Sequence, residues 1–142
     1  MAWQPTPYTA PLLVAAVASF AFAAYSVINR SRDGSGLLWS FVGVASTAGV
    51  WSLAYAGQLS ATTLSATLFF NRFVWLGSAG LAVAWPAFVL SYVDRGPWLR
   101  RRRFALFCLV PAAVTVAVWT VGVDPLFYLG PALVDAGGFL VL

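Results

Sequence analysis

The sequence predicts an all-α membrane protein, a polytopic bundle of four transmembrane helices. Three observations support this fold class. Hydrophobic residues make up 61% of the chain and charged residues only 8%, whereas about one quarter of a soluble domain is charged. The mean hydropathy is +0.86. Seven of the eight arginines lie in two short segments between long apolar stretches, a pattern that orients membrane proteins.

The first predicted transmembrane helix covers residues 12–28, which carry no charge and are just long enough to span a bilayer. A secretory signal peptide is the alternative, because Ala21-Phe22-Ala23 resembles a cleavage site. A signal peptide carries its positive charge before the apolar stretch, whereas Arg30 and Arg32 follow this one. The order of charges therefore favours a retained helix.

Three further helices are predicted over residues 37–58, 65–92 and 104–121. The third is the longest, and its 28 residues would form a helix of roughly 42 Å. Because the hydrocarbon core is only about 30 Å thick, this helix must tilt or overhang. Pro86 and Pro111 fall inside the third and fourth helices, where proline removes a backbone donor and bends the helix. Each bend is either a hinge or a static feature.

The arginines predict the orientation of the chain. Cytoplasmic loops of membrane proteins carry an excess of positive charge, so residues 29–36 and 93–103 are assigned to the cytoplasm. The N-terminus is then extracytoplasmic, and the protein is predicted to be a multi-pass protein of the cell membrane. The topology anchor is the run Arg100, Arg101, Arg102 and Arg103.

Residues 122–142 differ from the rest of the chain, because turn-forming pairs such as Asp124-Pro125 and Gly137-Gly138 occur in quick succession. This density argues against a further helix within the segment. The prediction is an irregular extracytoplasmic tail. Residues 1–142 are interpreted as a single partial transmembrane domain, interrupted as the chain enters a strand or a fifth helix.

Small side chains recur at intervals of three and four residues along the predicted helices. This spacing places them on one face of a helix, where a neighbouring helix can approach closely. The second helix has such a strip at Ala45, Gly49, Ser52 and Ala56, and the fourth has one at Ala105, Cys108, Ala112 and Thr115. In the third helix the strip, here called the small-residue seam, consists of Gly77, Gly80, Ala84, Ala87 and Ser91.

Arg72 is the one charged residue predicted to lie at membrane depth, about two turns inside the third helix. Asn71, Gln58 and Trp75 are its candidate companions in a polar site that could attract an anionic headgroup or ligand. The alternative is that the arginine extends its side chain to the interface without binding anything specific. Five residues separate Arg72 from Gly77, roughly 140° around a helix, so Arg72 is not expected to face the seam.

The residue inventory excludes several kinds of chemistry. The chain contains no histidine, lysine or glutamate and only one cysteine, Cys108. Without these residues there is no Schiff-base lysine, imidazole base or haem-ligating histidine, disulfide framework or cysteine-rich metal site. Cys108 is interpreted as a small buried packing residue. We predict no cofactor, no metal and no catalytic residue.

Four stretches of the chain follow a recognisable pattern: residues 50–58, 69–72 with 75–77, 85–92 and 98–103. Together they resemble the N-terminal seven-transmembrane region of archaeal, especially haloarchaeal, sensor histidine kinases. The resemblance implies a membrane-embedded sensory input domain that is normally followed by further helices and cytoplasmic kinase modules. The residues that match the family pattern are Trp51, Ala54, Arg72 and Gly77. The family usually has an acidic residue, a glutamine, a tyrosine and a glutamate at the positions of Gln58, Val74, Trp75 and Ser91. The loss of two carboxylates and a glutamine removes plausible partners of Arg72.

The predicted function is therefore the sensory input of a two-component signalling protein. The chain cannot itself be the kinase, because it lacks a phospho-acceptor histidine and an ATP-binding segment. The expected partners are the lipid bilayer and a cytoplasmic kinase module in cis or in trans, with a homodimer left open and no nucleic acid. The alternatives are a small transporter or transporter half, in which Arg72 would lie on an anion pathway, and an inactive structural membrane fragment.

Overall fold

A computed structural model describes residues 3–4, 6–29, 36–95, 102–120, 132–135 and 140–141 of the chain. All four predicted helices are present, and every boundary lies within three residues of its predicted position. The helices are α1 (Thr9–Ile28), α2 (Gly36–Ser60), α3 (Leu64–Tyr92) and α4 (Arg102–Thr120). Two short strands follow α4 in the chain, β1 (Val134–Asp135) and β2 (Leu140–Val141).

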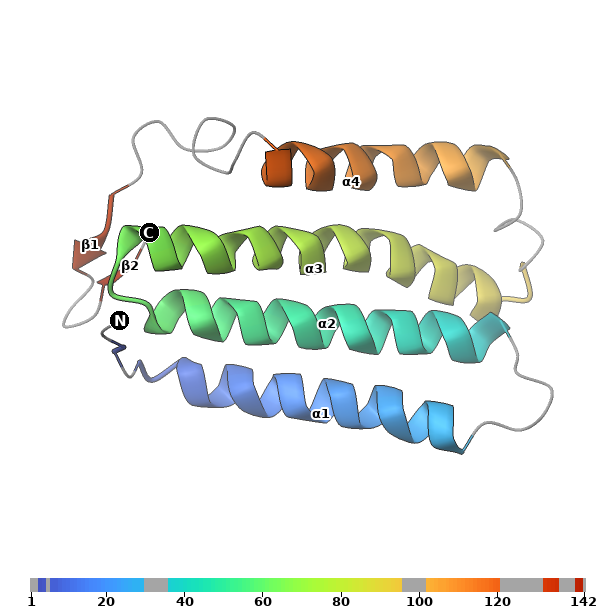
Figure 1. Cartoon of the computed structure of the whole chain (residues 1–142). Coiled ribbons are helices and arrows are strands. Elements are labelled where there is room, and N and C mark those ends of the chain that lie inside the picture. The colour runs from blue at the N-terminus through green and yellow to red at the C-terminus, as the bar shows by residue number, and fades with distance from the viewer. Residues whose placement is uncertain are drawn as a thin grey trace.

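The helices lie side by side in chain order, with neighbours antiparallel (Figure 1). Extensive contacts join α1 to α2 and α2 to α3, whereas α4 contacts α3 much more sparsely. We call the end of the bundle where α1 and α3 begin the leader end, and the opposite end, where α4 begins, the arginine end. The first three helices therefore form a packed body, and α4 stands apart from it.

Three of the described helices, α1, α2 and α3, are long and apolar enough to cross a membrane. The apolar part of α4, Phe104–Thr120, is shorter. Many large apolar side chains on the helices are exposed, including Phe22 at 62% and Val110 at 68%. Such surfaces are suited to lipid or to other helices. The predicted helical membrane protein is confirmed by these features.

Glycines allow α2 and α3 to approach each other closely. A Cβ atom added at Gly77 of α3 would lie 2.8 Å from the backbone nitrogen and Cα of Trp51 in α2. One added at Gly80 would lie 2.5 Å from the Thr47 methyl group. Both distances are shorter than the roughly 3.5–4.0 Å of ordinary carbon contacts. The backbones of α2 and α3 are therefore as close as they are because these two positions lack side chains.

Local signals define the two ends of α3. Thr63 has extended backbone angles and its side chain accepts a hydrogen bond from the Ala66 amide at 3.4 Å, as an N-cap does. At the other end Asp94 has a φ of 55°, and the Arg95 amide donates to the Leu90 carbonyl oxygen at 2.8 Å. This is the Schellman arrangement that ends helices, with aspartate at the left-handed position usually taken by glycine.

The described residues of the tail after α4 include two short strands, which the predicted irregular tail did not contain. Its two strands pair in an antiparallel register, with Val134 opposite Val141 and Asp135 opposite Leu140. They lie beside the leader end of the bundle (Figure 1). Most of the predicted tail lies outside the described residues. The same holds for most of the two arginine-rich segments, including the anchor residues Arg100 and Arg101.

Candidate functional site

The four residues of the predicted polar site lie toward the leader end, but they differ in environment. Asn71 is 3% exposed, whereas Arg72, Trp75 and Gln58 are half-buried. The Gln58 side-chain oxygen Oε1 is buried without a hydrogen-bond partner. Gly57 of α2 meets Phe70 of α3, so the antiparallel register brings Gln58 and Asn71 to about the same depth.

Arg72 makes no ion pair within the part of the chain that the structure describes. The four described helices contain no aspartate or glutamate at all. An arginine remains charged at any physiological pH. Its guanidinium is thus a positive charge that the described helices do not neutralise, which makes it a candidate binding group.

The small-residue seam faces α2 along much of its length. Gly77 and Gly80 meet Trp51 and Thr47, as described above. A Cβ atom added at Gly43 would lie 3.5 Å from the Ala84 Cβ atom, and one added at Gly36 would lie 3.9 Å from the Ser91 hydroxyl oxygen. In each pair the two residue numbers add to 127 or 128, as expected for one continuous antiparallel interface.

The predicted strip on α2 faces a different neighbour. A Cβ atom added at Gly49 would lie 2.8 Å from the ring of Phe20 in α1, and Ala45, Ser52 and Ala56 are buried. The side of α2 that meets the seam instead carries Gly43, Thr47 and Trp51. Opposite sides of α2 thus serve α1 and α3, and α2 is the central element of the packed body.

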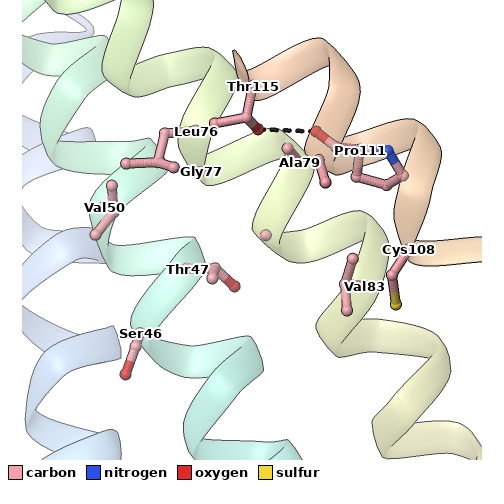
Figure 2. Close-up of a pocket in the computed structure, with 12 residues that line it drawn as sticks. Ser46, Thr47, Val50, Leu76, Gly77, Ala79, Val83, Cys108, Pro111 and Thr115 are labelled. Carbon is pink, nitrogen blue, oxygen red and sulfur yellow. Dashed lines mark hydrogen bonds between the residues drawn. The ribbon is translucent and has the colours of Figure 1, made fainter. Parts of the chain in front are cut away.

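An apolar groove of about 450 Å³ lies where α2, α3 and α4 meet. Figure 2 shows Ala79 and Val83 of α3 and Cys108 and Pro111 of α4 along it. Cys108 is half-buried in this groove and not fully buried as predicted. The lining residues are Ser46, Thr47, Val50, Leu76, Gly77, Ala79, Gly80, Val83, Cys108, Pro111, Ala112 and Thr115.

The groove lies where the packing of α4 against α3 is sparse. Apart from Leu76 and Val83, the side chains of these two helices along it are mostly small. Thr115 turns its hydroxyl back to donate to the Pro111 carbonyl oxygen at 2.8 Å (Figure 2). Near the leader end the two helices do meet, where the rings of Phe73 and Trp119 are 5.2 Å apart in an edge-on arrangement. This aromatic contact therefore lies beyond the leader end of the groove and is not part of its lining.

Gln4 forms a set of hydrogen bonds at the leader end, here called the Gln4 clasp, that no sequence pattern predicts. Its Nε2 donates to the Leu59 carbonyl oxygen at 3.1 Å and to that of Leu140 at 2.7 Å. The Leu140 amide donates to Gln4 Oε1 at 2.9 Å, and the Gln4 amide donates to the Ser60 carbonyl oxygen at 2.9 Å. One side chain thereby joins the leader, the end of α2 and strand β2.

Of the anchor arginines, the structure describes the side chain of Arg102, which is exposed at the start of α4. Among the described residues there is no cluster of three or more histidine, cysteine or acidic side chains that could hold a metal ion. The described site thus combines one unneutralised guanidinium, buried amide groups and an apolar groove. Such an arrangement is suited to binding and to helix movement.

Comparison with known proteins identifies the family. No curated protein and no solved structure matches the chain. A family model described as the N-terminal 7TM region of histidine kinase matches residues 11–142, which includes all four described helices except the first two residues of α1. The chain therefore belongs to the family of N-terminal seven-transmembrane regions of histidine kinases, which is a family of membrane sensory input domains.

Proposed function

We propose that this domain receives a signal within the membrane and relays it to a cytoplasmic kinase module, in the same polypeptide or in a separate one. The relay is a displacement of α4 relative to the packed body of α1, α2 and α3. The observation that carries the proposal is the unequal packing of the helices, since α2 and α3 meet backbone to backbone while a 450 Å³ groove separates α3 from α4.

Close and loose interfaces respond differently to a signal. A close-packed interface resists small displacements, because its atoms have no free volume into which to move. An element next to a groove can occupy two positions of similar energy, and a ligand that prefers one of them shifts the population. Small shifts of one helix against its neighbours are a common form of conformational switching.

The direction of signalling follows from the proposed orientation. The arginine-rich segments would lie in the cytoplasm and the leader end outside, in agreement with the positive-inside rule. The arginine end of α4 then faces the kinase, and the leader end, with the Gln4 clasp and Arg72, faces the signal. The resemblance noted above favours a two-component system of the archaeal, haloarchaeal type.

Two covalent locks test the relay. The first joins α3 to α4 by a short thiol cross-linker between the native Cys108 and a cysteine at Val83, both of which line the groove. The second joins α2 to α3 by a disulfide between Gly43→Cys and Ala84→Cys in a Cys108→Ala background. The 3.5 Å separation of the two Cβ positions lies within the roughly 3.5–4.5 Å range of natural disulfides.

Phosphorylation of the kinase is measured with radiolabelled ATP in membranes that contain the sensor chain and its kinase module. The α3–α4 lock is expected to hold phosphorylation at one level whatever the membrane conditions, since α4 can no longer move. The α2–α3 lock is expected to leave the response unchanged. A response that survives the first lock, or is abolished equally by both, would show that α4 does not carry the signal.

A further inference from the structure

Arg72 is aligned with the wall of the groove. The groove residues Leu76, Ala79 and Val83 follow Arg72 at intervals of four, seven and eleven positions. These intervals place the three groove residues on the same stripe of the helix as Arg72, each within about 40° of it. Arg72 thus lies one turn, about 6 Å, beyond the groove residue nearest the leader end.

The contact between Phe73 and Trp119 fixes the level of Arg72 on the neighbouring helix. The two rings are 5.2 Å apart, and the residue numbers add to 192. To within one residue, the same antiparallel register sets the groove residues Ala79 opposite Ala112 and Val83 opposite Cys108. It places Arg72 level with Trp119, at the leader-end mouth of the groove.

This mouth has the features of a membrane interface. Trp119 is 43% exposed, and at the same end Trp3 and Tyr8 are 54% and 57% exposed. Exposed tryptophan and tyrosine side chains concentrate at the level of the lipid headgroups. A long arginine side chain near that level extends its charge toward the headgroups. A guanidinium at this end of the bundle is therefore suited to the level of the headgroups, with the groove on its hydrocarbon side.

We propose that the groove holds one acyl chain of an anionic phospholipid whose phosphate pairs with Arg72. The apolar lining suits an acyl chain, and the volume of about 450 Å³ falls within the roughly 300–1,000 Å³ typical of ligand pockets. The charge of Arg72 suits an anion, and no carboxylate lies in the described helices. Arginine binds phosphate through paired, charge-assisted hydrogen bonds. The lipid would enter from the leaflet at the leader end.

A bound acyl chain would act on α4, the helix that moves in the proposed function. It would fill the space between α3 and α4 and so stabilise the separated position of α4. This regulatory consequence rests on the proposed function. Lipid binding does not depend on the proposed function, and its test measures no kinase activity. The binding proposal and the signalling proposal can therefore fail independently.

The test uses the whole chain in nanodiscs of phosphatidylcholine that contain a small fraction of a photoactivatable lipid. The three probes carry a diazirine on an acyl chain and are phosphatidylglycerol, phosphatidylcholine and a free fatty acid. After illumination, mass spectrometry locates the labelled residues. We expect phosphatidylglycerol to label the groove residues of α3 and α4, and unlabelled phosphatidylglycerol, unlike phosphatidylcholine, to compete.

Matched variants isolate the charge and the groove. Arg72→Gln is expected to reduce groove labelling by phosphatidylglycerol about tenfold, which corresponds to roughly 1.4 kcal/mol, and Arg72→Lys to retain most of it. Arg95→Gln removes the same charge from an exposed site at the arginine end and is expected to change nothing. Ala112→Leu fills the groove and should reduce labelling, whereas Ala113→Leu, at an exposed neighbour outside it, should not.

Three outcomes would overturn the proposal. Equal groove labelling by phosphatidylglycerol and phosphatidylcholine would show a groove filled by bulk hydrocarbon without headgroup recognition. Labelling by the fatty acid alone would identify a different source of the anion. Absence of groove labelling by every probe, in a chain that retains its helical circular dichroism, would show that protein and not lipid fills the groove.

Discussion

Replacing Gly77 by alanine is expected to weaken the packing of α3 on α2, and Gly43→Ala provides a matched control on the same interface. At Gly77 the new methyl group would lie 2.8 Å from the Trp51 nitrogen, Cα and Cβ atoms, about 0.7–1.2 Å inside ordinary contact distance. Two of these atoms belong to the backbone and cannot rotate away. At Gly43 the methyl group would lie 3.5 Å from the Ala84 Cβ atom, an ordinary contact.

The difference between the two variants isolates the steric term. Each substitution gains the same helix propensity, about 0.8–1.0 kcal/mol for alanine over glycine. Overpacking a filled interface costs typically about 1–3 kcal/mol, and only Gly77→Ala incurs this cost. We therefore expect Gly77→Ala to be less stable than Gly43→Ala by about 1–3 kcal/mol.

Reversible unfolding by an anionic detergent, followed by circular dichroism in mixed micelles, measures the free energy of unfolding of both variants and of the parent chain. Gly43→Ala is expected to equal or exceed the parent in stability. If Gly77→Ala proves as stable as Gly43→Ala, then α2 and α3 are not in backbone contact at this level. The packed body on which the signalling proposal depends would then not exist as described.

The remaining predictions concern the leader end. Gln58→Met is expected to raise the free energy of unfolding by about 1 kcal/mol, because it removes a buried oxygen that lacks a hydrogen-bond partner. The same substitution at Gln4 is expected to lower it by about 1–3 kcal/mol, because three side-chain hydrogen bonds are lost; equal effects at both sites would contradict the assignment. Gln4→Met should also speed hydrogen exchange of the Leu140 amide, measured by mass spectrometry, and unchanged exchange would mean that no clasp holds the tail. Thr63→Ala is expected to destabilise α3 by about 0.5–1 kcal/mol through loss of its N-cap, while Thr63→Ser should preserve it; an unaltered unfolding curve for Thr63→Ala would exclude the cap.

The helices were predictable because their determinants are local. Runs of apolar residues interrupted by charge and turn signals locate helices in a membrane protein, and every boundary fell within three residues of its predicted position. The spacing of Gly77, Gly80 and Ala84 also identified one face of α3 from the sequence alone, since three- and four-residue intervals have a direct geometric meaning.

The partner of each face was not predictable, because it depends on tertiary register. The spacing of Ala45, Gly49 and Ser52 identified a close-packing face of α2 but not its neighbour, and Gly49 meets Phe20 of α1. The seam meets Trp51 and Thr47 instead. A large side chain next to a glycine can form as close an interface as two small ones, and no periodicity rule distinguishes these solutions.

The candidate site was likewise predictable only in part. Helical geometry placed Arg72 off the seam, but only the register with α4 shows which groove it adjoins. The Gln4 clasp joins residues 136 positions apart in sequence, and a single glutamine in a leader carries no local signal of such a contact. Long-range hydrogen bonds of this kind form only where the fold brings distant residues together, so local sequence patterns do not predict them.

The central claim is that α4 moves against the packed body of α1, α2 and α3. Distance distributions between spin labels test it most directly. In a Cys108→Ala background, labels at the exposed positions Leu53 of α2 and Val116 of α4 report on α4. Labels at Leu53 and at the exposed Val17 of α1 report on the body. Pulsed electron resonance in nanodiscs is expected to give one narrow distance for α1–α2 and a broad or two-component distribution for α2–α4. Equally narrow single distances for both pairs would contradict the account.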